Sequence, residues 1–336
     1  MIKLFELFSG IGAPRMALEE LGVKYQSLGY SEINNNAIKA YCELFNDKPE
    51  NNYGDITKIE KLPNDIDILF HGSPCQDFSM AGLGKGGDLG SNTRSSLLYE
   101  TLRLVKTALP KVVIWENVMA VKYKKHVHNY NAYLEQMTEY GYQNYTHDLN
   151  AVDFGVPQNR PRTFCVSILK NANIKFEWLS IYKQPVILTD YIDFNIDNRN
   201  KVAPIYQKMV EEFEGLNGQN MENVILTCQS SNFRKGKPKF STTIVHCLCC
   251  RRDDYIKYSK GNYAYLTGKE KLKLQGFPDI ECINENQKHI VAGNSINVNV
   301  LKYIFSCFGN KFLKMPKQNR YTPLDYNYQQ TMLLAV

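Results

Sequence analysis

The sequence predicts a doubly wound, mostly parallel α/β sheet followed by a second, smaller domain. Residues 1–170 alternate short apolar runs with segments of helical spacing, which is typical of βαβ units. The alternation stops after Lys170, where an irregular connection covers residues 171–200. Strand-like pieces at 224–228 and 242–247 then indicate a separate unit. The apolar helical segment 290–309 is expected to pack back onto the first domain.

The elements of the first domain follow from the apolar pattern and from the positions of Gly and Pro. Residues 2–8 are the expected first strand. Pro14 suits the first position of a helix at 15–21, and Gly22 ends that helix. The same criteria predict further strands at 25–31, 66–70, 111–115, 142–149 and 163–168, helices at 36–45, 96–108 and 131–140, and a third strand in chain order that ends at 54–56.

The composition is ordinary for a soluble globular enzyme, with 43% hydrophobic and 22% charged residues among 336. No apolar run approaches the ~18 residues of a membrane span, and the N-terminus lacks a signal-peptide pattern. The nine cysteines are scattered and form no compact disulfide framework, which favours a reducing compartment. We therefore expect a cytoplasmic protein that does not bind a membrane.

The positive charge is concentrated in one segment. The formal net charge is +6, and residues 201–275 hold 13 lysine and arginine residues against 7 aspartate and glutamate residues. This segment carries the whole surplus, as expected for a surface that faces a polyanion. A solvated basic surface without such a partner is the alternative that charge alone leaves open.

A cysteine lies where a buried strand ends. The apolar run 67–70 leads into Gly72-Ser73-Pro74-Cys75, which places the thiol of Cys75 at the carboxyl edge of the sheet, where open α/β sheets bind ligands. The glycine-rich residues 76–95 follow and are typical of a loop that closes over a substrate. The alternative is a small buried thiol without chemistry, which is the commoner state of a cysteine.

Acidic and basic side chains are expected beside this thiol. Glu116 follows the strand at 111–115 and would pair an acid with the nucleophile at the next strand edge. Arg160 and Arg162 lie two residues apart in an extended stretch, so their side chains should point the same way. Such cations lower the pKa of a nearby cysteine. A surface salt bridge is the alternative for the two arginines.

The first turn points to a nucleoside ligand. Gly10 and Gly12 follow the first strand, and Arg15 replaces the third glycine of a dinucleotide fingerprint, which argues against NAD. Glu32 lies about 20 residues further on, where an acid can bind both ribose hydroxyls. Asp55 could accept a hydrogen bond from an exocyclic amine. A helix-capping acid and a plain turn are the respective alternatives for these two acids.

Taken together, these blocks resemble a cytosine-C5 DNA methyltransferase of the bacterial or phage type. The resemblance covers about residues 8–300, and its most specific part is the order Pro-Cys-Gln, Glu-Asn-Val and Gln-x-Arg-x-Arg. The matching blocks are Phe8-Ser9-Gly10-Ile11-Gly12, Glu32, Gly54-Asp55-Ile56, Gly72-Ser73-Pro74-Cys75-Gln76, Leu97, Glu116-Asn117-Val118, Gln158-x-Arg160-x-Arg162, Leu274-Gln275-Gly276-Phe277-Pro278 and Gly293-Asn294-Ser295.

The resemblance implies the methyltransferase fold and the cofactor S-adenosylmethionine, with S-adenosylhomocysteine as product. Ile33 stands where the family often has an aromatic residue that stacks on adenine, so that face would be held less firmly. The implied cofactor-binding residues are Phe8, Gly10, Ile11, Gly12, Glu32, Ile33, Asp55, Ile56, Pro74, Leu97, Asn294 and Ser295.

The resemblance also implies a mechanism. Cys75 would add to C6 of cytosine, Glu116 would hydrogen-bond N3 and the exocyclic amine, and Arg162 would hold O2, while Arg160 would help to set the Cys75 loop. C5 would then take the methyl group, and loss of the C5 proton would expel the thiol. Because the base is unreachable inside a duplex, it must be flipped out, with loop 76–95 as the clamp.

DNA reading would fall mostly to residues 201–260. The basic loop around Arg234 mixes base-edge readers with phosphate-binding cations, although a solvated loop is the alternative. The segment His246-Cys247-Leu248-Cys249-Cys250 has no second ligand pair at zinc spacing, so we expect a strand with buried thiols and no metal. The expected DNA-binding residues are Gln76, Ser79, Arg94, Gln158, Arg234, Lys235 and Thr243.

The expected organisation is a catalytic and cofactor-binding domain at 1–170, completed by a returning segment at 285–315. A small target-recognition domain covers 171–284, and 316–336 is a C-terminal extension. The expected partner is double-stranded DNA, with a cognate restriction endonuclease as a functional partner, and we expect a monomer.

Three other functions share some of these sequence features. An RNA cytosine-C5 methyltransferase would use the same catalytic parts, but the Cys-Phe-Thr element of the eukaryotic tRNA-modifying relatives is absent. A binding module without chemistry conflicts with intact Cys75, Glu116 and Arg162. A nicotinamide oxidoreductase lacks its third glycine and would not need a basic second domain.

Overall fold

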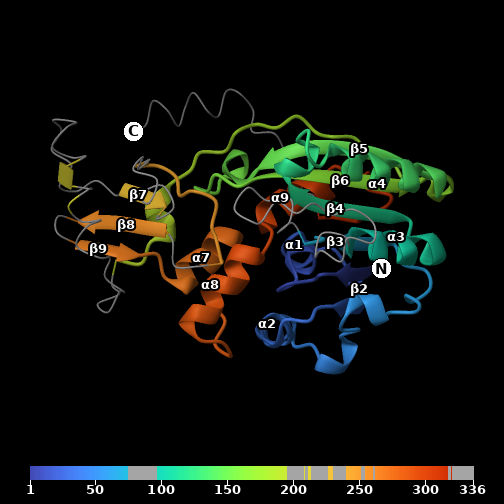
Figure 1. Ribbon diagram of the computed structural model, residues 1–336, viewed down its shortest axis with the longest axis horizontal. Helices are drawn as coiled ribbons and strands as arrows, with labels where there is room; N and C mark the ends of the chain where they lie inside the picture. The colour runs from blue at the N-terminus through green and yellow to red at the C-terminus, as the bar shows by residue number, and fades with distance from the viewer. Residues whose placement is uncertain are drawn as a thin grey trace.

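The computed structural model describes residues 1–74, 97–194, 208, 211–212, 226–229, 240–250, 254–259, 262–316 and 319. Its centre is a six-stranded sheet in the order β2-β1-β3-β4-β6-β5 (Figure 1). The first four of these strands are parallel, and β6 runs antiparallel to both of its neighbours. The strands are β1 (Ile2–Leu7), β2 (Tyr25–Ser31), β3 (Ile68–His71), β4 (Val112–Val118), β5 (Tyr142–Asn150) and β6 (Pro161–Leu169).

Helices cover both faces of this sheet. Ile114 of β4 packs in one apolar cluster and its neighbour Trp115 in the other, because successive side chains of a strand point to opposite faces. This arrangement confirms the doubly wound, mostly parallel α/β sheet. The first cluster includes α1 (Ala13–Glu20), α2 (Asn35–Phe45) and α9 (Val298–Ser306), and the second includes α3 (Leu98–Ala108) and α4 (Val127–Glu139).

The end of the described chain returns to the sheet. Helix α9 packs against α1, and its Tyr303 ring lies 4.8 Å from the ring of Phe154. Helices α7 (Gly268–Gln275) and α8 (Glu285–Asn294) pack against each other before it. The residues 290–309, expected as one helix, form the end of α8 and then α9, because the side chain of Asn297 caps a new helix.

A second, antiparallel sheet has the order β7-β8-β9 and lies beyond α7 and α8 (Figure 1). Its strands are β7 (Leu226–Gln229), β8 (Asp254–Ser259) and β9 (Asn262–Tyr265). The strand expected at 242–247 is absent from the described segment 240–250. Only Ser241 and Val245 form isolated bridges there, to Thr227 and Gln158 respectively. We call β7–β9 with residues 240–250 the small unit.

The prediction of a strand that ends at residues 54–56 was also wrong. Asn52 forms a single isolated bridge with Tyr30, and Asp55 then begins the 3-10 turn η2 (Ile56–Lys58). The Asp55 side chain accepts a hydrogen bond from the N–H of Thr57, which favours a turn over a strand.

The remaining short 3-10 segments are η1 (Pro49–Asn51), η4 (Met119–Lys122), η5 (Ala151–Phe154), η6 (Lys170–Ala172) and η7 (Leu188–Tyr191). Within the described ranges, no helix has both the length and the apolar character needed to cross a bilayer.

Candidate active site

The carboxyl ends of β3 and β4 bring two of the predicted motifs side by side. These strands are parallel neighbours, with His71 opposite Trp115. The side chain of Ser73 accepts a hydrogen bond from Trp115 Nε1 at 3.0 Å, and the Ser73 carbonyl accepts one from Asn117 Nδ2 at 3.2 Å. The chain that leads toward residue 75 is therefore fixed to β4. Cys75 itself lies outside the described residues, as do Gln76, Ser79, Arg94 and the rest of loop 76–95.

Glu116 and Arg162 face each other across the antiparallel strands β4 and β6. Glu116 lies inside β4 rather than after it, because this strand continues to Val118, which is opposite Arg162. The carboxylate Oε1 is 3.0 Å from Arg162 Nε, and the two side chains are only 12% and 14% exposed, respectively. This pair places one acid and one cation at the sheet edge beside Gly72, whose added Cβ would lie 3.6 Å from Glu116 Oε2.

Burial raises the pKa of Glu116, and the positive charges of Arg162 and Arg160 oppose that effect without cancelling it. The net effect is a raised pKa, so the Glu116 carboxyl is protonated at higher pH than the carboxyl of a surface glutamate. A carboxyl that can hold a proton at this edge can donate a hydrogen bond as well as accept one.

Arg160 joins three segments of the chain. Its guanidinium donates to the carbonyls of Leu248 at 3.1 Å, Gly293 at 3.0 Å and Ser295 at 2.6 Å. Both Arg160 and Arg162 also reach Cys247, whose Sγ lies 3.5 Å from a nitrogen of each guanidinium. The two arginines thus point the same way, as expected, and Arg160 holds the small unit against the turn after α8.

Gln158 has a similar joining position. It is fully buried, donates to the carbonyl of Leu274 at 3.2 Å and accepts from the N–H of Leu248 at 3.4 Å. The Gln158 side chain therefore joins α7 to the small unit in this arrangement, and its contact with DNA stays a prediction. Thr243 is exposed, and Arg234 and Lys235 lie outside the described residues.

The glycine turn after β1 is held by Glu32. One carboxylate oxygen accepts from the N–H of Gly10 at 2.9 Å, and the other accepts from the N–H groups of Ile33 and Asn34. Gly12 has a φ of +79°, and a Cβ there would lie 2.4 Å from the Phe45 ring, so glycine is required. Glu32 therefore shapes the turn that was expected to receive the cofactor, and Ile11 is buried beneath it.

Sequence reasoning missed Asn52. Its side chain accepts from the N–H groups of Glu32 and Gly54, both at 3.0 Å, and donates to the Glu32 carbonyl at 2.9 Å. This amide ties the end of β2 to the turn that contains Asp55. Its place two residues before Gly54 was the only signal in the sequence.

Open space adjoins both of these turns. A Cβ added to Gly10 or to Gly54 would meet no atom within 4 Å. The Ser9 hydroxyl is buried and makes no hydrogen bond within the described part of the chain. The neighbouring Ile33 side chain is 73% exposed. These features leave room for a ligand that would contact the backbone at both turns.

The other expected cofactor residues differ in access. Ile56 and Ser295 are buried, whereas Asn294 is exposed and accepts a hydrogen bond from the thiol of Cys250 at 2.7 Å. The Asp55 carboxylate accepts from the Thr57 backbone and hydroxyl, and these bonds hold its pKa below the usual value. Phe8, Pro74 and Leu97 are partly buried.

Known methyltransferases are similar to this chain over most of its length. Type II methyltransferase M.NgoBI of Neisseria gonorrhoeae is 32% identical over 320 residues, which cover 90% of this chain and 91% of the relative. Type II methyltransferase M2.ScrFI of Lactococcus lactis subsp. cremoris is 28% identical over 373 residues, which cover 91% and 98%.

Solved structures share the fold. The Entamoeba histolytica methyltransferase EhMeth has a TM-score of 0.64 at 18% identity, with 91% of this chain and 97% of that chain covered. The Dnmt2 methyltransferase of S. pombe has a TM-score of 0.63 at 18% identity, with 91% and 97% covered. A family model described as C-5 cytosine-specific DNA methylase matches residues 2–309. The match over nearly the whole chain shows that this protein is a member of the C-5 cytosine-specific DNA methylases.

Proposed function

We propose that this enzyme transfers a methyl group from S-adenosylmethionine to C5 of a cytosine flipped out of duplex DNA, through a transient bond between Cys75 and C6. The observation that carries the proposal is the buried Glu116–Arg162 pair, 3.0 Å apart, at the strand edge that leads to Cys75. The names of the bacterial relatives support a methyltransferase of restriction–modification type, with a cognate endonuclease as functional partner.

The proposed binding of the methyl donor uses the two turns beside β1 and β2. The open space at Gly10 and Gly54 would receive the nucleoside, and the turn that Glu32 holds would line one side of that space. When bound, the donor would supply an electrophilic methyl group on a sulfonium. Ser9, whose buried hydroxyl makes no hydrogen bond within the described residues, would gain a partner there.

The chemistry proposed for the protein begins at the ring of the base. The Cys75 thiolate adds to C6, and the electron pair moves toward C5, which then takes the methyl group. A protonated Glu116 donates to N3, and its raised pKa supports that role. Arg162 would hold O2 while it remains beside Glu116. Loss of the C5 proton to a base restores the ring double bond and expels the thiolate.

The small unit is proposed to read the DNA. It is joined to the catalytic part by Gln158 and Arg160, so the reading surface and the Glu116–Arg162 pair would keep one geometry. We propose the division into residues 1–170 with 285–315 for catalysis and 171–284 for recognition. The packing of α9 on α1 supports the return of the chain. Flipping the base costs a few kcal/mol, which contacts from both parts would offset.

Two measurements in sequence test this function. Bisulfite sequencing of DNA from cells that express the chain should reveal one methylated site. A duplex with 5-fluorocytosine at that site should then form a denaturant-resistant adduct with the enzyme when S-adenosylmethionine is present. The adduct should disappear in Cys75→Ala and persist in Cys282→Ala, which removes an exposed thiol instead. An adduct in both variants, or in neither, would contradict the role of Cys75. Methylation of tRNA instead of the duplex would favour an RNA substrate.

A further inference from the structure

A cavity lies at the edge of the sheet opposite the candidate active site. It has a volume of about 1130 Å³. Its lining includes the residues at or just before the starts of three parallel strands, namely Ile2, Asp67 and Lys111. The candidate active site lies at the carboxyl ends of the same strands. The cavity is therefore a separate place in the fold, and nothing in the proposed function uses it.

Basic side chains surround this cavity without matching acids. Lys111 is paired with Asp67 at 2.7 Å. Lys24, Lys175, Lys311 and Lys314 also line the cavity, and none of these four has an ion pair within the described part of the chain. Asp67 is the one carboxylate among the lining residues. Cations gathered without counter-charges create a positive potential that attracts anions.

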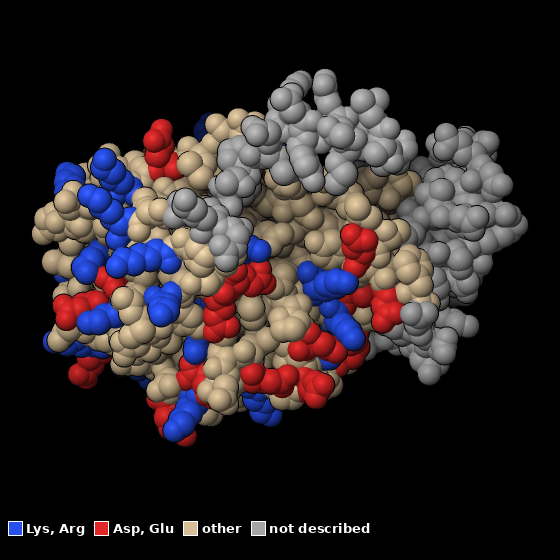
Figure 2. Space-filling view, turned by 180° about the vertical axis from the view of Figure 1, so that it is seen from behind, with Lys and Arg blue, Asp and Glu red and all other residues tan. Residues whose placement is uncertain are grey.

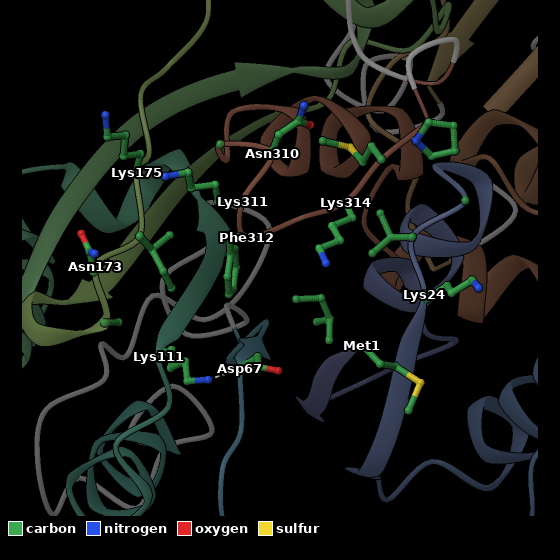
Figure 3. Close-up of a pocket in the computed structure, with 18 residues that line it drawn as sticks. Met1, Lys24, Asp67, Lys111, Asn173, Lys175, Asn310, Lys311, Phe312 and Lys314 are labelled. Carbon is green, nitrogen blue, oxygen red and sulfur yellow. Dashed lines mark hydrogen bonds and ion pairs between the residues drawn. The ribbon is translucent and has the colours of Figure 1, made fainter.

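Figure 3 shows how these groups are arranged. The Lys314 side chain and the Phe312 ring extend into the middle of the cavity, Lys175 and Lys311 lie together at one edge, and Lys24 lies at the other. Lys175 and Lys311 lie close together because the Gly309 N–H, two residues before Lys311, donates a hydrogen bond to the Lys175 carbonyl. Figure 2 shows that lysine and arginine side chains also gather at the end of the molecule away from the small unit.

The walls between these cations are apolar. They are formed by Ile2, Val23, Ile174, Phe312, Met315 and Pro316. Apolar walls with a few polar groups, at about this volume, are typical of small-molecule sites. Inorganic phosphate chains would leave these walls unused. A fatty acid has a single negative charge, which would leave most of the unpaired lysines without a counter-charge.

We propose that this cavity binds a nucleoside polyphosphate. Its planar base would lie against the Phe312 ring, because aromatic rings stack on bases. Its phosphates would be bound by Lys311 and Lys314, with Lys24 or Lys175 contributing at the edges, since ammonium groups bind phosphate as point charges. This site is independent of the proposed methyl-donor site and would bind its ligand whether or not the transfer mechanism is correct.

Calorimetric titration of the full chain with ATP tests the proposal. S-adenosylhomocysteine is kept at saturation, and the titration is repeated in Glu32→Gln, so that binding at the methyl-donor turn is recognised. We expect one ATP to bind per chain in the unmodified protein and in Glu32→Gln. Lys311→Gln/Lys314→Gln should raise the Kd about tenfold or more, because two phosphate contacts are lost. Lys106→Gln/Lys170→Gln removes two exposed lysines outside the cavity and should leave the Kd unchanged.

Further measurements separate the contribution of the base to binding from that of the phosphates. Phe312→Leu should weaken ATP several-fold and leave tripolyphosphate unaffected. ATP should also protect Lys314 from acetylation in the unmodified protein, which requires no variant to fold. Absence of ATP binding, equal effects in the two double variants, or tripolyphosphate binding as tightly as ATP would each overturn the proposal. Displacement of ATP by duplex DNA that lacks the methylation site would also overturn it, since that would indicate a general surface for phosphate backbones.

Discussion

Arg162 Nε lies 3.0 Å from Glu116 Oε1, and the pair is largely removed from water at the edge of the sheet. The two residues of the pair lie on the antiparallel strands β4 and β6. The register of these strands places Arg162 opposite Val118, which is two residues beyond Glu116. A buried pair of this kind contributes little net stability, because desolvation offsets attraction, but its halves depend strongly on each other. The pair can therefore be tested through stability and through activity separately.

Removal of one partner should destabilise the protein more than removal of both. Arg162→Gln leaves a buried carboxyl without its cation, which typically costs about 3–5 kcal/mol. Glu116→Gln/Arg162→Gln should recover a large part of this loss in the free energy of unfolding, measured by urea titration at pH 8. Additive losses in the double variant would show that the two groups do not interact in solution.

Activity should fall as pH rises through the pKa of Glu116. Burial raises that pKa, so the protonated carboxyl persists above its usual range and is lost at higher pH. The measurement is kcat/KM for methyl transfer across pH, with ¹³C-labelled glutamate NMR to follow the Glu116 carboxyl directly. In Glu116→Gln, the residual kcat/KM should not show this fall at high pH. A fall that is retained in the variant would assign it to another group.

Ser73→Ala should slow turnover while leaving methyl-donor affinity unchanged. The variant loses the hydroxyl that accepts from Trp115 Nε1 and Asn117 Nδ2, so the chain leading to Cys75 is less well fixed. Misplacement of a nucleophile by a fraction of an ångström lowers kcat by about tenfold or more. Ser167→Ala is the matched control, because it removes another buried hydroxyl, on β6, away from this edge. Equal kcat losses in both would indicate a general stability effect.

Much of this architecture could be predicted from local sequence. The edge positions of Ser73 and Glu116 follow from where apolar runs end, since parallel strands present their carboxyl ends together. Arg162 reaches the same edge because β6 runs antiparallel to β4, which no local pattern indicates. The prediction of a strand that ends at residues 54–56 was wrong, and the turn that the sequence left open as the alternative is favoured there by the hydrogen bond from the Thr57 N–H to the Asp55 side chain. The roles of Asn52 and Arg160 were missed for another reason. Asn52 binds Glu32, which is 20 residues away, and the carbonyls that Arg160 binds are 88 to 135 residues away. No local periodicity reports such contacts.

Arg160→Lys should destabilise the joint between the small unit and the turn after α8. The Arg160 guanidinium donates to the carbonyls of Leu248, Gly293 and Ser295 together. A lysine ammonium lacks this planar arrangement of N–H donors and cannot reach all three carbonyls. The expected loss is about 2–4 kcal/mol in the free energy of unfolding. Arg103→Lys is the control, since Arg103 also donates to two carbonyls but is partly exposed. A loss below that of the control would contradict the joining role.

The carboxyl of Glu6 should make stability fall as pH rises from about 4.5 to about 7. Glu6 is fully buried in β1, its Oε2 accepts from the Tyr41 hydroxyl at 2.6 Å, and its Oε1 has no partner within the described residues. Burial raises its pKa from 4.5 to about 7, against the opposing effects of Tyr41 and Arg15. Between these values the folded chain holds a proton that the unfolded chain has released.

The stability from this proton is fully present below pH 4.5 and is lost by about pH 7, a total of about 3 kcal/mol from the shift in pKa. Glu6→Gln cannot titrate, so the difference in unfolding free energy between it and the unmodified protein should change by this amount across the window. Urea titrations from pH 4.5 to 8 measure it, with Glu60→Gln as the control for loss of an exposed carboxyl. If the Glu6→Gln difference stays constant with pH, the buried carboxyl is ionised throughout, and Arg15 rather than a proton neutralises it.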